Sequence, residues 1–180
     1  VMLKGYDEFD HHSVTLRLAD EAGLDYVAFK VDSPETLESL KDATEAFGYP
    51  VDEVPANTNQ PGFGKRYGFT ICTGHRIELY ADVEKAEQVP MTHNPHPWVE
   101  APRGMRAQRF DHCLLYGPNI AEAERYFTEV LGMFAPEVCN TPEGNRFATW
   151  LTSGNKAHDI AFVEYEKPGK IHHMAFLLQD

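Results

Sequence analysis

Two short apolar segments of this chain each carry one histidine in a position suited to chemistry. His112 lies in residues 109–116, and His173 lies 61 positions later in residues 170–178. In both segments apolar residues recur with the two-residue period of a β-strand, so side chains two positions apart share a face. A lone histidine in such a strand is usually a hydrogen-bonded core residue. Two of them favour a metal site, because neutral imidazoles bind divalent transition metals and one carboxylate would complete a facial triad.

The sequence around these histidines resembles the extradiol ring-cleaving dioxygenases of the vicinal-oxygen-chelate superfamily. The resemblance is carried by Phe-Asp-His-Cys-Leu-Leu-Tyr-Gly at 110–117, Ala-His-Asp-Ile-Ala-Phe at 157–162 and Gly-Lys-Ile-His-His-Met-Ala-Phe at 169–176. It runs along the whole chain, including residues 74–80 and 94–98, and points to the catechol 2,3-dioxygenases in particular. Each piece alone is weak, but the combination is specific.

The resemblance implies roles for three histidines and places other parts of the site outside the chain. His112 and His173 would bind Fe(II), and His158 would be an acid/base at the substrate. The family's third iron ligand, a glutamate on a late strand, would lie beyond Asp180. Because such enzymes also begin some tens of residues before the position of Val1, we expect an internal fragment that is inactive by itself.

The chemistry explains why these residue types are needed. Triplet O₂ does not react readily with a closed-shell catechol, so a redox-active metal must bring the two together. Fe(II) on two histidines and one carboxylate leaves open positions for both catechol oxygens and O₂. A histidine of near-neutral pKa can take the first substrate proton. The resemblance therefore implies extradiol cleavage of catechol or an alkylcatechol to 2-hydroxymuconic semialdehyde-type products, in the catabolism of aromatic compounds.

Three apolar side chains and one acid are further candidates. Trp150, Leu114 and Phe162 lie on strands that flank the histidines and are candidate walls for an aromatic ring, with core packing as the alternative. Glu78 lies in a segment similar to the family's metal-glutamate strand. We interpret it as a degenerate counterpart of that ligand, with a solvated strand carboxylate as the alternative.

The remaining histidines have less specific settings. His172 and His173 are adjacent, so on a regular strand they point to opposite faces. Periodicity hardly chooses between them, and the resemblance favours His173. His75 lies in a hairpin turn. Four others lie in polar or proline-rich stretches and are expected at the surface, namely His11, His12, His93 and His96.

Composition limits the partners and the compartment. Sixteen Lys and Arg residues against 28 Asp and Glu residues give a formal net charge of −12, which disfavours binding to nucleic acid or to anionic membranes. No apolar run approaches the roughly 20 residues that span a bilayer. The three cysteines cannot all pair and show no CxxC spacing, which indicates the cytoplasm. The resemblance adds a homotetramer as the expected assembly.

The pattern of elements predicts an α+β fold of repeated βαβββ modules that form open, funnel-like mixed sheets, as in glyoxalase-like proteins. Residues 1–82 would be an incomplete, non-catalytic domain, 83–105 a proline-rich linker and 106–180 an incomplete catalytic domain. The expected strands cover residues 13–18, 26–31, 68–72, 77–80, 147–151 and 158–164, and the expected helices end near Gly48 and Gly132.

Two other functions stay open at this point. One is a metal-dependent lyase or thiol transferase of the glyoxalase type, which keeps the fold and changes the chemistry. The other is a metal-free small-molecule-binding module of the same fold. A glutamate-bearing strand after Asp180, preceded by a histidine and a tyrosine, would select the dioxygenase.

Overall fold

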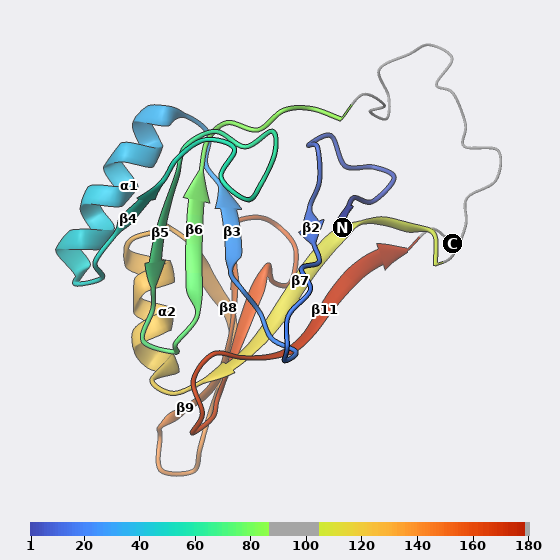
Figure 1. Ribbon diagram of the computed structural model, residues 1–180. Coiled ribbons are helices and arrows are strands. Elements are labelled where there is room, and N and C mark those ends of the chain that lie inside the picture. Colours follow the sequence, from blue (N-terminus) through green and yellow to red (C-terminus); the bar gives the residue numbers. More distant parts are fainter. Residues whose placement is uncertain (87–104, 179–180) are drawn as a thin grey trace.

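The computed structural model describes residues 1–86 and 105–178, which form two main mixed sheets and two helices (Figure 1). The predicted class, α+β with open mixed sheets, is confirmed. The helices are α1 (Pro34–Phe47) and α2 (Ile120–Glu129). The strands are β1 (Met2–Leu3), β2 (Val14–Thr15), β3 (Val27–Lys30), β4 (Asp52–Val54), β5 (Arg66–Thr70), β6 (Arg76–Tyr80), β7 (Ala107–Gly117), β8 (Phe134–Asn140), β9 (Arg146–Thr152), β10 (Ile160–Glu164) and β11 (Lys170–Leu178).

The two sheets repeat one topology. The first has the strand order β3-β6-β5-β4 and the second has β11-β7-β10-β9-β8. In each, the strand before the helix pairs in parallel with the last strand of the module, β3 with β6 and β7 with β10, and the other pairs within the module are antiparallel. The second sheet has one strand more, because β11 pairs antiparallel with the other edge of β7.

The ends of α1 follow from local chemistry. The hydroxyl of Ser33 accepts a hydrogen bond from the backbone N–H of Thr36 at 3.1 Å, and Pro34 occupies the first turn, where its missing N–H costs nothing. Gly48 ends the helix at φ 118°, a left-handed conformation that glycine adopts without strain. The predicted end at Gly48 is confirmed, whereas α2 ends at Glu129, before Gly132.

The two halves share one hydrophobic core. Tyr126 on α2 is fully buried, and its hydroxyl lies 2.9 Å from the hydroxyl of Thr44 on α1. Its ring also packs against Tyr49 and Phe69 from the first half, with centroids 5.1 and 5.4 Å away. Aromatic burial of this kind contributes both apolar area and ring–ring contacts. The position of α2 is therefore set by packing against the first half of the chain.

Several sequence expectations differ from the structure. The strand expected at 13–18 is reduced to Val14–Thr15, and β8 was not expected because its residues lack strand alternation and are mostly exposed. The domain division at 82 and 105 stays a prediction. Most of the linker, with His93 and His96, lies outside the described residues. No helix in the described ranges is long and apolar enough to span a membrane.

A buried turn connects the first sheet to the start of β11. His75 lies in the β5–β6 turn, as predicted, with 3% of its surface exposed. Its Nε2 is 3.1 Å from the backbone oxygen of Lys170 and must donate to it, while Nδ1 can accept from the Thr73 hydroxyl at 2.8 Å. The neighbouring Gly74 has φ 81°, and a Cβ there would lie 2.5 Å from Pro168. The turn thus fixes where β11 begins.

Burial lowers the pKa of His75, and the hydrogen bond to the Lys170 backbone offsets this only in part. The imidazole therefore stays neutral in the folded chain while an unfolded chain takes up a proton as the pH falls. This contribution to stability is present above the ordinary histidine pKa of about 6.5 and is lost as the pH falls towards the lower folded value.

We expect the free energy of unfolding, measured with urea, to fall less between pH 7.5 and pH 5.5 in His75→Gln than in the parent. His11→Gln, which changes an exposed histidine, is the control and should keep the parental pH dependence. An unchanged pH dependence in His75→Gln would show that His75 is not the group that titrates.

Candidate metal and substrate site

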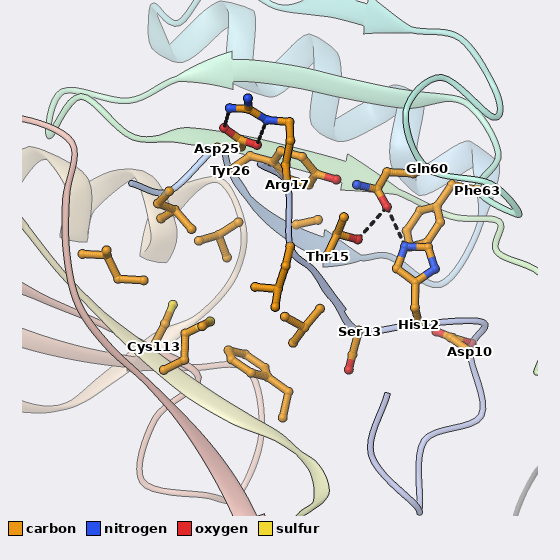
Figure 2. Close-up of a pocket in the computed structure, with 18 of the residues that line it drawn as sticks. Asp10, His12, Ser13, Thr15, Arg17, Asp25, Tyr26, Gln60, Phe63 and Cys113 are labelled. Carbon is orange, nitrogen blue, oxygen red and sulfur yellow. Dashed lines mark hydrogen bonds and ion pairs between the residues drawn. The ribbon is translucent and has the colours of Figure 1, made fainter. Parts of the chain in front are cut away.

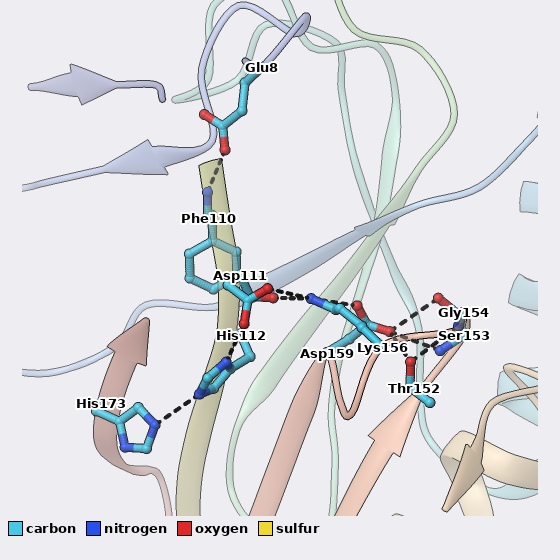
Figure 3. Close-up of polar contacts among 10 residues, drawn as sticks. All are labelled: Glu8, Phe110, Asp111, His112, Thr152, Ser153, Gly154, Lys156, Asp159 and His173. Atoms are coloured by element: carbon cyan, nitrogen blue, oxygen red, sulfur yellow. Dashed lines mark hydrogen bonds and ion pairs between the residues drawn. The ribbon is translucent and has the colours of Figure 1, made fainter. Parts of the chain in front are cut away.

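The structure brings His112 and His173 together on adjacent strands. Their Nε2 atoms are 3.2 Å apart across the β7–β11 pair (Figure 3). Two nitrogen ligands at about 2.1 Å from one ion, at right angles, would be about 3.0 Å apart. The spacing of the two imidazoles therefore fits two neighbouring positions of one coordination sphere.

A β-bulge places His173 on this face. Ile171 pairs with Leu115 and His173 pairs with Leu114, so His172 is an extra residue on β11. Without it, His173 would face the core side of the sheet, where Leu115 is fully buried. The expectation that His172 and His173 point to opposite faces is wrong, because their Nδ1 atoms are only 2.6 Å apart.

A second bulge lies beside the other histidine. His112 pairs with Ala175 and Phe110 pairs with Phe176, which leaves Asp111 as the extra residue on β7. The Asp111 carboxylate therefore reaches the ring of His112, with Oδ2 2.7 Å from Nδ1. The hydrogen bond with His112 lowers the pKa of Asp111, against its partial burial. Nothing in the alternation of apolar residues signalled this role of Asp111.

The third predicted histidine lies beside the pair. The ring centroids of His158 and His112 are 4.1 Å apart. Partial burial lowers the pKa of His158, and the neighbouring His112 and Lys156 lower it further, which favours the neutral imidazole. His173 is affected in the same direction by burial, His172 and His112. All three predicted histidines thus converge on one place, with uncharged rings favoured for His158 and His173.

Two of the three predicted wall residues lie on the same face. Across the sheet, His173 pairs with Leu114, Leu114 with Ala161, and Ala161 with Trp150, which makes one row of side chains over four strands. Directly paired residues share a face, so Leu114 and Trp150 extend from the histidines over the sheet. The small Ala161 between them was missed by the sequence analysis, because only the register reveals it.

Phe162 does not join this row. It follows Ala161 on β10 and therefore points to the opposite face. There it is fully buried, with its ring centroid 5.4 Å from that of Phe127 on α2. The structure places Phe162 in the core, which was the alternative for this residue.

A cavity of about 900 Å³ lies on the core side of β7 and β11, away from the histidine row (Figure 2). Cys113 and Met174 line it from the two strands, and neither His112 nor His173 does. Burial raises the pKa of the Cys113 thiol to about 12, so this sulfur is not a thiolate at neutral pH. The cavity is therefore separate from the candidate metal site.

Glu78 and His12 have settings that the sequence did not indicate. Glu78 is 4% exposed, with one carboxylate oxygen 2.7 Å from Nε of Arg66 and the other 3.0 Å from Nε of Arg76. It is not a solvated acid, and its interpretation as a degenerate metal ligand stays a prediction. His12 was expected at the surface and is buried, with Nε2 2.5 Å from Oε1 of Gln60.

The described residues bring two candidate metal ligands, His112 and His173, to one place, without a third. Within residues 1–86 and 105–178, no cluster of three or more His, Cys, Asp or Glu side chains could hold a metal ion. Two imidazoles alone bind a divalent ion weakly, since the anionic ligand supplies charge and the third facial position. His112 and His173 fit the two histidine positions of a facial triad made of two histidines and one carboxylate.

Both halves of the chain match known protein families. Residues 24–84 match the family described as “Catechol 2,3-dioxygenase-like N-terminal domain”, and residues 109–180 match “Glyoxalase/Bleomycin resistance protein/Dioxygenase superfamily”. The chain is 40% identical to the metapyrocatechase of Pseudomonas sp. (strain CF600), over 99% of this chain and 58% of that protein. It is 24% identical to a manganese-dependent 2,3-dihydroxybiphenyl 1,2-dioxygenase of Geobacillus genomosp. 3, over 100% of this chain and 58% of that protein.

A solved structure shows the same arrangement of the chain. The 2,3-dioxygenase LapB from Pseudomonas sp. KL28 superimposes with a TM-score of 0.94 at 42% sequence identity, over 99% of this chain and 62% of that chain. The chain thus spans somewhat less than two thirds of the length of these relatives.

Proposed function

We propose that the protein to which this chain belongs cleaves catechol or an alkylcatechol with O₂ in the extradiol position. The premise is that the chain belongs to the glyoxalase/bleomycin resistance protein/dioxygenase superfamily and carries a catechol 2,3-dioxygenase-like N-terminal domain. One observation carries the proposal. The Nε2 atoms of His112 and His173 are 3.2 Å apart, as neighbouring ligands of one metal would be. His158 lies beside this pair, where a substrate hydroxyl would be bound.

The proposed cofactor is Fe(II), held by Nε2 of His112 and of His173. A glutamate after Asp180 would be the third ligand. Bound there, the metal would activate O₂ beside the catecholate and let electrons pass between them. Because one relative is named for manganese, Mn(II) is the second candidate, and the two histidines suit either ion.

In the proposed mechanism His158 moves the proton. Its ring is favoured in the neutral form, so a ring nitrogen can accept a hydrogen from a substrate hydroxyl as the catechol binds. The same group can return this proton after ring cleavage. Because no three His, Cys, Asp or Glu side chains in the described residues could hold one metal ion together, we assign His158 as an acid/base and not as a ligand.

The row of Leu114, Ala161 and Trp150 is the proposed substrate wall. Leu114 and Trp150 offer apolar surface to an aromatic ring and exclude water, and Ala161 leaves space between them. Neighbouring strands are about 4.8 Å apart, so Trp150 lies about 10 Å from Leu114 across β10. This distance suits one aromatic ring with a short substituent.

The two alternatives that the sequence left open are less well supported than the dioxygenase. A metal-free binding module gives no reason for the bulge at His172, which brings the two imidazole nitrogens to the spacing of metal ligands. A glyoxalase-type metalloenzyme would keep the two ligands, but the 40% identity to a metapyrocatechase favours the dioxygenase. Cys72, Cys113 and Cys139 are all free, which supports a reducing compartment, and we propose the cytoplasm. A homotetramer stays a prediction.

The first test compares this chain with a version extended past Asp180. We expect the extended protein, loaded with Fe(II), to turn catechol in air into a yellow ring-cleavage product. The 180-residue chain should bind Fe(II) poorly and give no yellow product, because the anionic ligand is missing. Robust turnover by the 180-residue chain would show that its true ligands all lie within residues 1–180. A colourless reaction of the iron-loaded extended protein would contradict the proposed activity.

The second test concerns His158 in the extended protein. His158→Gln keeps a polar side chain but cannot carry a proton at neutral pH, so kcat should fall about 10²-fold or more while the iron content stays at one per chain. His11→Gln is the matched control for a histidine distant from the site. Parental turnover in His158→Gln would rule out the acid/base role.

A further inference from the structure

Lys156 connects the loop that carries His158 to the strand that carries His112. Its ammonium group donates to the backbone oxygen of Asp111 and lies 3.4 Å from the carboxylate oxygen Oδ1 of the same residue (Figure 3). On its other side it lies 3.0 Å from Oδ1 of Asp159. One cation thus bridges two carboxylates from segments that are far apart in the sequence.

The loop end of this bridge is itself fixed. Oδ2 of Asp159 accepts hydrogen bonds from the backbone N–H of Ser153 at 2.8 Å and from the hydroxyl of Thr152 at 3.0 Å. Burial acts to raise the pKa of Asp159, but the hydrogen bonds from Ser153, Lys156 and Thr152 and the charge of Lys156 outweigh it, so the pKa is lowered. Asp159 is therefore a charged anchor, and His158 lies between it and Lys156 in the sequence.

At the strand end of the bridge, Asp111 determines which ring nitrogen of His112 carries a hydrogen. An ionised carboxylate can only accept, so the 2.7 Å contact with Oδ2 of Asp111 requires that Nδ1 of His112 carries the hydrogen. In the neutral form of the ring, Nε2 then keeps its lone pair, and this nitrogen lies 3.2 Å from Nε2 of His173. The β-bulge at Asp111 makes this contact possible, because adjacent residues on a regular strand point to opposite faces.

We propose that Asp111, Lys156 and Asp159 form a positioning bridge that presents Nε2 of His112 to the metal and holds the His158 loop beside it. The inference rests on the proposed function for its purpose, but its geometry can be tested without metal. Asp111 and Lys156 touch neither substrate nor metal in this account. They act through His112 and His158. Mutating a residue that is hydrogen-bonded to a metal-binding histidine typically lowers the metal affinity about 10–100-fold.

The first measurement reads the tautomer of His112 in the metal-free chain by long-range ¹H–¹⁵N NMR. The parent should show a hydrogen on Nδ1 and none on Nε2. Asp111→Leu should lose this preference, whereas Asp111→Asn should retain it because the amide oxygen still accepts. Asp42→Leu, at an exposed position on α1, is the control for a removed surface carboxylate. If Asp111→Leu does not fold, Asp111→Ala removes the same acceptor without added bulk.

The second measurement reads the contact between the rings of His112 and His158. Their centroids are 4.1 Å apart, so the parent should show a nuclear Overhauser effect between their carbon-bound ring hydrogens. Lys156→Met keeps the aliphatic stem but removes the bridge, and the effect should weaken or disappear. Lys156→Arg, which retains the charge and the donors, should restore it.

The third measurement links the bridge to the metal. Zn(II) affinity of the extended protein should fall 10–100-fold in Asp111→Leu and remain within about twofold of the parent in Asp42→Leu. An unchanged His112 tautomer in Asp111→Leu, or an unchanged ring contact in Lys156→Met, would overturn the bridge. If both NMR results are as expected, the bridge stands even where iron-loaded protein fails to cleave catechol, which would count against the proposed function alone.

Discussion

The site depends on how β11 pairs with β7. An antiparallel pair in perfect register would send His173 to the core side, because its neighbours Ile171 and Leu115 pair there. The extra residue at His172 shifts the pairing by one, and the second bulge, at Asp111, lets its carboxylate reach the ring of His112. A one-residue slip in a strand moves every following side chain to the other face. The irregularity at His172 thus decides whether the two imidazoles can meet, and the one at Asp111 decides which carboxylate reaches His112.

The rest of the fold holds these strands in place. Beneath the histidine row, Leu115 and Phe162 are fully buried in a core to which both halves of the chain contribute. At its start, β11 is fixed by His75 and by the hydrogen bond from the N–H of Gly169 to the backbone oxygen of Thr73 at 2.9 Å. The first half therefore has a structural part in the site, although none of its side chains lies in the histidine row.

The sequence predicted which histidines come together better than it predicted how their side chains are oriented. Period-2 alternation and the family resemblance were enough to select His112, His158 and His173, and Gly48 indicated the end of α1. Alternation could not reveal the bulges, because a bulge is an interruption of the period on which such a prediction relies. It therefore gave the wrong relative orientation for His172 and no role for Asp111.

Other differences have the same origin in long-range contacts. Phe162 looks like a pocket residue beside His158 in the sequence, but the register of β10 turns it towards Phe127. His12 looks exposed in a polar stretch, but Gln60, 48 residues away, supplies the partner that lets it be buried. Neither contact has a local signal. Register and distant hydrogen-bond partners appear only once the chain has folded.

In the proposed site, His112 and His173 bind the same metal through Nε2. This assignment is tested most directly by an anomalous difference map, recorded at the iron absorption edge, from crystals of the Fe(II)-loaded extended protein. We expect one peak about 2.1 Å from both Nε2 atoms, with His158 outside bonding distance. A peak bound to only one of the two histidines, or at another place in the chain, would contradict it.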